Sequence, residues 1–207
     1  MGPPLPPVAA GFALSKPAPI KVELFLDLVC PFSRKMWGVI TSAVLAKYGG
    51  SCEFRVHQVP QPWHPAGAWV HEAALAVQQV APDKYVPFVD SVYAEFDKGR
   101  FKDDDTWSKT RPQVYDELLD LAASAGAERS AVAAVLAPNP GGGNAGTGAT
   151  QALKWAVKFH RCRGVHVTPT VHVNGLEAGI ISSGWTAEQW CAFLEPMGAD
   201  NFQGTKL

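Results

Sequence analysis

Cys30 is the residue of this sequence that is best suited to do chemistry. It opens the segment Cys30 to Ser33, which follows an apolar run from Ile20 to Val29 and precedes a helical pattern. The apolar residues of that pattern recur at helical spacing: Met36, Trp37, Ile40, Val44 and Tyr48. A strand, a turn and a helix in this order place the Cys30 sulfur at a helix N-terminus, where unpaired backbone N–H groups and the helix dipole favour an anion.

This expected environment favours the thiolate form of Cys30. The pKa of a free cysteine is about 8.5, and a helix N-terminus can lower it to roughly 3.5–7.5. Arg34 and Lys35 add positive charge close by in the sequence. We therefore interpret Cys30 as a candidate nucleophile. The alternative is a small buried apolar residue, which is the usual role of a free cysteine.

A second stretch, far along the chain, supports this interpretation. Val167 to Thr170 contains a Thr-Pro pair directly before the apolar residues of a predicted strand. The early strand, Cys-x-x-Ser and helix, followed by a late Thr-Pro strand, resembles the thioredoxin superfamily. Within that superfamily, residues 25–33 (FLDLVCPFS) are similar to the segment that opens DsbA-type oxidoreductases and kappa-class glutathione transferases. The resemblance covers the chain from about Ile20 to Met197.

The DsbA-type and kappa-class proteins differ at the positions of Cys30 and Ser33. Dithiol members of the DsbA group carry a second cysteine where this chain has Ser33, and in the kappa class both positions are typically serine. This chain is therefore intermediate between the two. The resemblance implies an α/β, thioredoxin-like fold with an inserted helical domain (DsbA-like).

The resemblance also implies the geometry of a substrate site. The Thr168–Pro169 peptide bond is expected to be cis and to face Cys30, so that the backbone of Thr168 is offered to a substrate chain. Pro31 and Phe32 are expected to line this substrate-binding site together with Thr168 and Pro169. From spacing alone, a trans proline that opens a strand is the alternative.

Two strand signals flank the first predicted helix. Apolar and polar residues alternate from Ile20 to Leu28 and again from Cys52 to Val59. A strand, helix and strand of these lengths predict a right-handed βαβ unit with parallel strands. Cys30 and Cys52 then lie at opposite ends of the sheet, separated by several strand residues that each span about 3.3 Å. A disulfide needs Cα atoms within about 7 Å of each other. Cys52 is therefore not expected to resolve a disulfide at Cys30.

The rest of the chain predicts a helical block followed by a hairpin and a last helix. The expected helices are 66–80, 82–98, 112–125, 128–136 and 150–161, with a solvated charged loop at 102–105. Pro169 to Ile181, around the turn Asn174-Gly175, predicts a hairpin, and Thr186 to Gln189 predicts a helix capping box. The expected domains are an irregular Pro-rich arm (1–19), a thioredoxin-like domain (20–62 with 163–197), an inserted helical domain (63–162) and a tail (198–207).

The composition argues against several classes of function. The chain has 207 residues, 18% of them charged, and a net charge of −1, so no nucleic-acid partner is expected. No apolar stretch approaches the roughly 20 residues of a transmembrane helix, so no membrane partner is expected. The N-terminal stretch lacks the charged start of a secretory signal, so no such signal is expected either. The four cysteines are scattered without metal-ligand spacing, so no metal site is expected. Because no secretory signal is expected, the cysteines are interpreted as reduced thiols and the location as cytosolic (cytoplasmic).

Asp27 is a second candidate for a chemical role. It shares a strand face with Phe25 and Val29 and, if both faces of the strand are covered, is expected to be buried near Cys30. Such a carboxylate can relay a proton, accept capping hydrogen bonds or serve only as a hydrogen-bonded structural group. The sequence leaves these roles open.

The favoured hypothesis is a monothiol thiol–disulfide oxidoreductase. Cys30 attacks a protein or small-molecule disulfide, Ser33 and the helix stabilise the thiolate, and an external thiol resolves the mixed disulfide. Glutathione is the obvious co-substrate for that last step, and no bound cofactor is expected. Cys162 and Cys191 stay open as internal resolving thiols.

Two other functions remain open. As the kappa-class resemblance implies, the Cys-x-x-Ser segment could hold a glutathione thiolate while the helical insertion supplies a pocket for an apolar substrate. Trp63, Trp69 and Tyr93 are the candidates to line that pocket. Alternatively, the chain is a catalytically inactive module that holds an extended peptide at its Thr-Pro loop.

Overall fold

The computed structural model describes residues 4–198 of the chain. Within them the chain forms two compact units that alternate along the sequence. The helical unit comprises residues up to 10, residues 27–29 and residues 58–164. The sheet unit comprises residues 11–26, residues 30–57 and the residues from 165 onward. The predicted tail, 198–207, lies outside the described residues except for Gly198.

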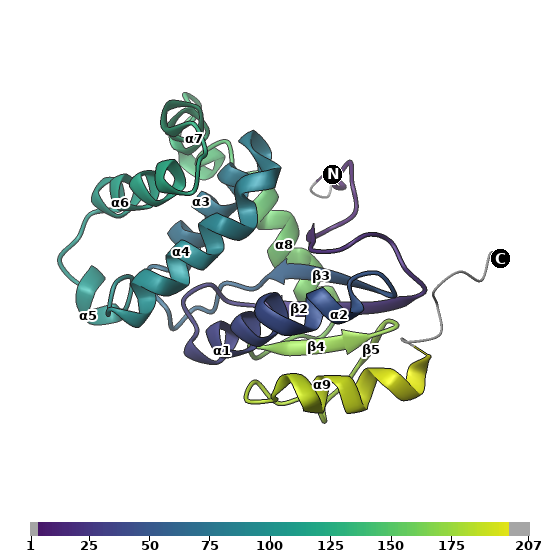
Figure 1. The fold of residues 1–207 in the computed structure, drawn as a ribbon. Helices are drawn as coiled ribbons and strands as arrows, with labels where there is room; N and C mark the ends of the chain where they lie inside the picture. The colour runs from purple at the N-terminus through teal and green to yellow at the C-terminus, as the bar shows by residue number, and fades with distance from the viewer. Residues whose placement is uncertain (1–3, 199–207) are drawn as a thin grey trace. The chain divides into compact units, whose positions relative to one another are not determined.

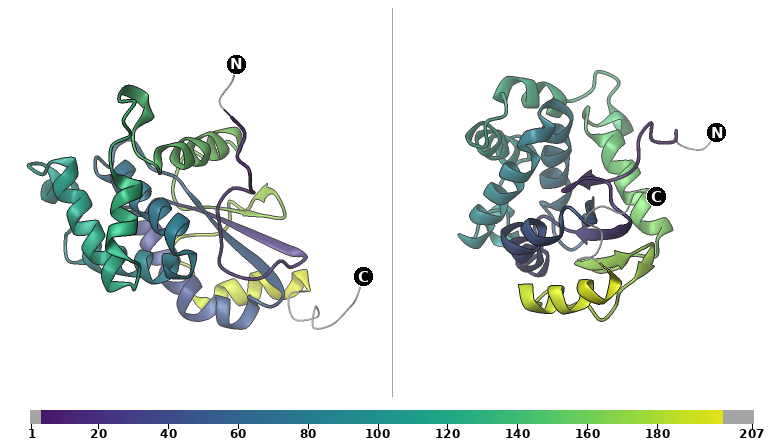
Figure 2. Two further views of the ribbon diagram at one scale, coloured as in Figure 1. Left: turned by 90° about the horizontal axis from the view of Figure 1, so that it is seen from above. Right: turned by 45° about the vertical axis from the view of Figure 1, so that its right-hand side comes forward.

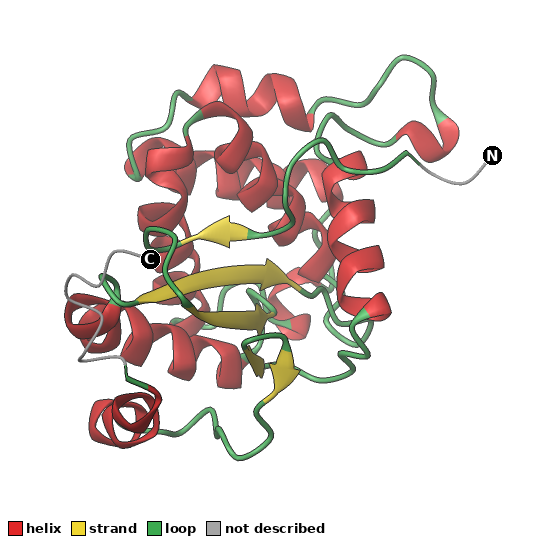
Figure 3. Ribbon diagram, turned by 90° about the vertical axis from the view of Figure 1, so that its right-hand side faces the viewer, coloured by secondary structure: helices red, strands yellow, loops and turns green. Residues whose placement is uncertain are grey.

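The sheet unit contains a five-stranded sheet in the order β1-β3-β2-β4-β5, drawn in yellow in Figure 3. The pairs β1–β3, β2–β4 and β4–β5 are antiparallel. The strands are β1 (Phe12–Ala13), β2 (Ile20–Leu26), β3 (Cys52–Gln58), β4 (Thr170–Val173) and β5 (Leu176–Glu177). The neighbours β2 and β3 are joined through a helix (Figure 1), which agrees with the predicted crossover and confirms the α/β class.

The N-terminal stretch is not irregular throughout, in contrast to the predicted arm over residues 1–19. β1 forms at Phe12–Ala13, where Phe12 is paired with Val56 of β3. Just after it, the Ser15 hydroxyl donates to the Cys52 carbonyl oxygen (2.8 Å) and accepts from the Phe54 N–H (2.8 Å). The edge of β3 thus supplies hydrogen-bond partners that a Pro-rich composition does not reveal.

The first long helix of the chain has three parts, α1 (Pro31–Val39), the π-helical turn η1 (Ile40–Val44) and α2 (Leu45–Tyr48). Met36, Trp37, Ile40, Val44 and Tyr48 are all buried, as their helical spacing predicts. The later helix α9 (Ala187–Leu194) lies beside this helix (Figure 2). There Glu195, which follows α9, accepts hydrogen bonds from Lys47 (2.8 Å) and Tyr48 (2.9 Å).

The helical unit contains the helices predicted between residues 66 and 162, and their ends agree to within one or two residues. The exception is the predicted helix 82–98, whose first turn is a 3₁₀ helix. They are α3 (Gly67–Val80), α4 (Tyr85–Asp97) after the 3₁₀ turn η2 (Pro82–Lys84), α6 (Arg111–Ser124), α7 (Arg129–Leu136) and α8 (Thr150–Cys162). The Gly-rich stretch between α7 and α8 contains the 3₁₀ turn η3 (Gly143–Ala145) and an isolated antiparallel bridge between Pro138 and Thr147. Their apolar faces give this unit its core, which includes Val70, Phe88 and Leu118.

The charged segment 102–105 is exposed over residues 102–104, as its composition predicts, but residues 103–105 belong to a helix instead of a loop. α5 (Asp103–Thr106) is a single turn that follows Phe101. The Asp105 carboxylate accepts from the Phe101 N–H (2.9 Å) and forms an ion pair with Lys109 (2.8 Å). These two contacts stabilise the helical turn in a segment whose charges alone predict a loop.

The C-terminal part of the sheet unit agrees only partly with its predicted hairpin. The Asn174-Gly175 turn forms, with both residues at positive φ, but β5 ends at Glu177 instead of Ile181. β5 lies at the sheet edge, and Leu176 is 77% exposed, so no core contact extends the strand. The predicted capping box of α9 is confirmed at Thr186 and Gln189. The following 3₁₀ turn is η4 (Glu195–Met197).

Candidate active site

Cys30 is the N-cap residue of α1, as the sequence predicts. Its backbone is extended (φ −98°, ψ 124°), Pro31 occupies the start of the helix, and the Arg34 N–H donates to the Cys30 carbonyl oxygen (3.0 Å). The first turn of α1 contains no acidic residue. The positive end of the helix therefore acts on Cys30 without a competing negative charge in that turn.

The Thr168–Pro169 peptide bond is cis, and this loop faces Cys30 within the sheet unit. The Cys30 thiol donates to the Thr168 carbonyl oxygen, which lies 3.5 Å from the sulfur. Strand pairing explains the contact, because Phe25 of β2 pairs with Thr170 of β4. The residues just after β2 and just before β4 are thereby brought to the same end of the sheet.

The surface around this contact is apolar. Phe32 is 54% exposed and Val167 is 61% exposed, while the Cys30 residue itself is almost covered, at 4%. Pro31 is also exposed. Val167 is a candidate binding residue that the sequence interpretation missed; its position next to the Thr-Pro pair was the only signal for it.

Ser33 takes the position of the second cysteine of dithiol sites. Its side chain is completely buried on the inner side of α1. It is therefore not presented to a substrate as Pro31 and Phe32 are. A hydrogen bond from the Ser33 hydroxyl to the Cys30 thiolate stays a prediction.

Asp27, three residues before Cys30, has a fully buried carboxylate in the helical unit. Its Oδ1 accepts from the Val29 N–H (3.1 Å) and contacts His71 Nε2 (3.1 Å). Its Oδ2 accepts from the Gln61 N–H (2.9 Å) and contacts His64 Nδ1 (2.7 Å). The carboxylate thus caps the backbone of the segment that precedes Cys30, which is one of the roles that the sequence left open.

These contacts shift the pKa values of Asp27 and His64. Burial raises the pKa of Asp27, but the hydrogen bonds from His64 and His71, the charge of His71 and the Val29 N–H together hold it well below its ordinary value. The hydrogen bond to Asp27 raises the pKa of His64. Both histidines were missed by the sequence interpretation, because they lie 37 and 44 residues from Asp27 and no local pattern links them to it.

Comparison with known proteins assigns the family. The model of the thioredoxin family matches residues 15–195, which include Cys30, the Thr168–Pro169 loop and both units. The chain belongs to the thioredoxin family. The superfamily resemblance stated from the two short motifs is thereby confirmed. No curated protein matches the sequence at a significant level.

Solved structures of the thioredoxin family have the same fold as this chain. A candidate protein-disulfide isomerase from Pseudomonas syringae is 22% identical, with a TM-score of 0.71 over 86% of this chain and 94% of that chain. The thiol-disulfide exchange protein α-DsbA2 from Wolbachia pipientis is 15% identical, with a TM-score of 0.67 over 90% and 87%. BdbD from Bacillus subtilis is 18% identical, with a TM-score of 0.65 over 90% and 91%. The DsbA-like fold predicted from the sequence is therefore confirmed.

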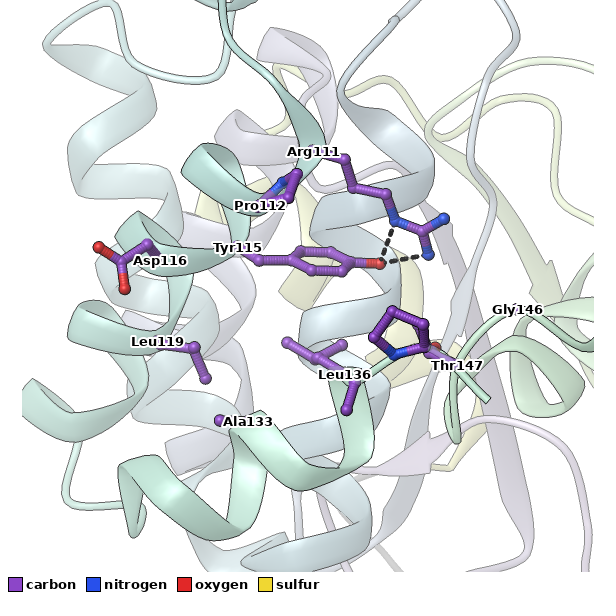
Figure 4. Close-up of a pocket in the computed structure, with 11 residues that line it drawn as sticks. Arg111, Pro112, Tyr115, Asp116, Leu119, Ala133, Leu136, Gly146 and Thr147 are labelled. Carbon is purple, nitrogen blue, oxygen red and sulfur yellow. Dashed lines mark hydrogen bonds between the residues drawn. The ribbon is translucent and has the colours of Figure 1, made fainter. Parts of the chain in front are cut away.

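The helical unit of this thioredoxin-family protein contains an apolar cavity of about 300 Å³ (Figure 4). It lies between α6 and α7, and its lining includes Arg111, Tyr115, Leu119, Leu136 and Thr147. The Arg111 guanidinium donates twice to the Tyr115 hydroxyl at one end of the cavity.

The residues predicted to line an apolar pocket are not those of this cavity. Tyr93 is buried in the core, where its hydroxyl donates to the Asp27 carbonyl oxygen (3.2 Å). Trp63 is 57% exposed and packs edge-on against His64. Trp69 is half-buried on α3 and is also absent from the lining. The prediction was wrong for Tyr93, because helical spacing alone cannot distinguish an aromatic residue of the core from one that lines a cavity; for Trp63 and Trp69 it stays a prediction.

The four cysteines of the chain are all free thiols. Cys52 opens β3 and is buried, which raises its pKa. Cys162 is exposed at the end of α8, and Cys191 is half-buried on α9, 3.5 Å from Lys47 Nζ. Over residues 4–198, no group of three His, Cys, Asp or Glu residues is arranged to hold a metal ion. No helix in the same range is long and apolar enough to cross a membrane.

Proposed function

We propose that this protein is a monothiol thiol–disulfide oxidoreductase in which Cys30 is the nucleophile and an external thiol such as glutathione resolves the mixed disulfide. The observation that carries the proposal is the position of Cys30, at the N-terminus of α1 and 3.5 Å from the Thr168 carbonyl oxygen. The similarity of the fold to proteins described as thiol-disulfide exchange proteins supports the same chemistry.

The site suits an extended substrate. Thr168 is half-buried and precedes β4, so its backbone N–H and carbonyl are in position to pair with a peptide in the manner of an added strand. Phe32 and Val167 add an exposed apolar surface for the side chains of that peptide. A disulfide held in this way brings one of its sulfurs to Cys30.

The reaction proceeds by two thiol–disulfide exchanges. In the first, the Cys30 thiolate attacks a sulfur of the substrate disulfide; a Cys30 mixed disulfide forms and the other half leaves as a thiolate. In the second, a glutathione thiolate attacks the mixed disulfide and releases Cys30 as a thiolate again. When the substrate is a glutathionylated protein, its thiol is released reduced, and the glutathionyl group passed to Cys30 leaves with one free glutathione as glutathione disulfide.

The second exchange needs an external thiol because Ser33 replaces the internal one. A hydroxyl does not attack a disulfide under these conditions, so the adduct at Cys30 persists until another thiol arrives. Glutathione is abundant in a reducing compartment, which agrees with the cytosolic location proposed from the sequence.

The test is to map where glutathione attaches and which thiol the activity needs. After incubation with glutathione disulfide, peptide mass spectrometry is expected to find the adduct at Cys30 in preference to the exposed Cys162. Reduction of a glutathionylated peptide by glutathione is expected to be lost in Cys30→Ser and kept in Cys162→Ser and Cys191→Ser. Full activity of Cys30→Ser contradicts the proposal, and loss of activity in either of the other two variants contradicts resolution by an external thiol.

The Cys30-to-Ser33 segment leaves open a second candidate, a glutathione transferase of the kappa type. Such an enzyme joins the glutathione sulfur to an electrophilic carbon and displaces a leaving group such as chloride. Conjugation of glutathione to an aromatic chloride, without activity on glutathionylated peptides, supports this candidate against the first. A protein that binds extended peptides but has neither activity is instead an inactive binding module.

A further inference from the structure

The segment between β2 and Cys30 is held by side chains at each of its three residues. The Asp27 carbonyl oxygen accepts from the Tyr93 hydroxyl (3.2 Å), the Leu28 nitrogen lies 3.3 Å from His71 Nε2, and the Val29 N–H donates to Asp27 Oδ1 (3.1 Å). This segment belongs to the helical unit, and the next residue in the chain is the nucleophile. The Asp27 carboxylate is therefore only three residues along the chain from Cys30.

The Asp27 carboxylate carries a negative charge in a site without solvent, since the side chain is 0% exposed. His64 supplies a counter-charge at 2.7 Å from Oδ2. Of the two histidines on Asp27, only His64 reaches solvent: its side chain is 20% exposed, whereas that of His71 is 0% exposed. His64 is therefore the member of this cluster that can exchange a proton directly with water.

We propose that His64 is a positioning residue for the reaction of Cys30, acting through Asp27 by neutralising a buried negative charge three residues before the nucleophile. This inference rests on the proposed function, because it assigns His64 a part in the same thiolate chemistry. It goes beyond that proposal in naming a residue from the helical unit that controls how readily Cys30 ionises.

The physical reason is repulsion between two negative charges. Three residues of chain span at most roughly 10–11 Å, and at that distance an uncompensated carboxylate in a protein interior disfavours a second anion. With His64 protonated, its positive charge adds to the other partners of Asp27 and counters the carboxylate, which favours the Cys30 thiolate. When His64 loses its proton, that positive charge is removed and the thiolate becomes less favourable.

Two further titratable groups face the pair. His71, on α3, contacts the other oxygen of Asp27 (3.1 Å) and also Gln58 Oε1 (2.9 Å). Asp103, on α5, favours the protonated form of His64 through its negative charge. Of these two groups, Asp103 favours the protonated form of His64.

The experiment compares the rate of Cys30 alkylation by iodoacetamide against pH in four proteins: wild type, His64→Asn, Asp27→Asn and the double variant. The asparagine amide at position 64 can still donate to Asp27 Oδ2, but it cannot take up a proton. At pH 6, His64→Asn is expected to react about three- to tenfold more slowly than wild type, and the difference is expected to vanish at high pH, where His64 of the wild type has also lost its proton. Asp27→Asn is expected to react at least as fast as wild type.

The double variant distinguishes this role from a purely structural one. If His64 acts through the Asp27 charge, the effect of His64→Asn disappears when Asp27 is already asparagine. An equal rate for wild type and His64→Asn at pH 6 overturns the inference, and so does an effect that persists in the double variant. If Asp27→Asn does not fold, the pH profile of His64→Asn alone decides. Asp120→Asn, which removes an exposed carboxylate paired with Arg129, is the control for loss of one negative charge.

Failure of the inference is distinguishable from failure of the proposed function. If wild-type Cys30 forms no mixed disulfide with glutathione, the proposed function fails whatever the variants do. If it forms that adduct while His64→Asn and wild type have identical profiles, only the role of His64 is refuted.

Discussion

The sulfur of Cys30 lies 3.5 Å from the carbonyl oxygen of Thr168, although 138 residues separate the two in the sequence. One partner caps a helix, and the other precedes a strand through a cis peptide bond to Pro169. The antiparallel pairing of β2 with β4 brings them together. The proposed nucleophile and the proposed peptide-binding backbone are thereby placed at the same end of one sheet.

Replacing Ser33 with cysteine is expected to convert the monothiol site into a dithiol site. Ser33 lies three residues after Cys30 on α1, so a sulfur at this position faces the same side of the helix as Cys30. The Ser33→Cys variant is expected to reduce insulin with a dithiol reductant, an activity that wild type lacks. Because Ser33 is completely buried, the larger sulfur is expected to cost roughly 1–3 kcal/mol of stability. A folded variant without reductase activity indicates that the two positions are not in reach of each other.

The exposed apolar surface beside Cys30 is expected to bind substrate without affecting the intrinsic reactivity of the thiol. Val167→Asp is expected to lower the rate with a glutathionylated peptide about tenfold, since it places a charge where an apolar side chain docks. Alkylation of Cys30 by the small reagent iodoacetamide is expected to change much less. Leu176→Asp, at a similarly exposed position on β5, is the matched control and is expected to leave both rates unchanged. Equal losses in the two variants refute a specific role for Val167.

The stability of the protein is expected to depend on pH through Asp27 and His64. The lowered pKa of Asp27 contributes stability above its unfolded value of about 3.9, and this contribution is lost as the pH falls toward the folded value. The raised pKa of His64 contributes stability below its unfolded value of about 6.5, and this is lost as the pH rises through the folded value. The two contributions are therefore both present between about pH 4 and pH 6.5.

Urea unfolding at several pH values checks this expectation. The free energy of unfolding lost in His64→Ala relative to wild type is expected to be larger at pH 5.5 than at pH 9. Asp27→Ala leaves two histidines without their partner and is expected to cost roughly 3–5 kcal/mol at pH 5.5. A loss in His64→Ala that is constant across this range contradicts an electrostatic origin.

The buried carboxylate of Glu72 is expected to be essential to the helical unit. It accepts hydrogen bonds from Arg111 (2.6 Å), Thr150 (2.5 Å) and the Tyr115 hydroxyl. Glu72→Ala removes the shared acceptor of three groups from α6 and α8 and is expected to lower the free energy of unfolding by roughly 3–5 kcal/mol.

A surface carboxylate provides the control for the Glu72 prediction. Glu188→Ala, at an exposed position on α9, is expected to cost about 1 kcal/mol or less in the same denaturation experiment. Similar losses in the two variants indicate that the Glu72 hydrogen bonds contribute little.

The sequence by itself determined the features that depend on neighbouring residues. The strand, cysteine and helix around Cys30, the Asn174-Gly175 turn and the capping box at Thr186 all formed where their local patterns predicted them. Each of these signals needs only a few residues, because helix caps, tight turns and hydrophobic periodicity are local. The short Thr-Pro motif was interpreted correctly only with the help of the superfamily resemblance.

Only the tertiary structure decided which distant groups meet. It brought Thr168 to Cys30, gave the buried Asp27 carboxylate its partners His64 and His71, and formed the helical turn α5 where composition predicted a loop. No local pattern encodes these contacts. They arise from strand register and helix packing, which depend on the whole chain burying its apolar surface at once.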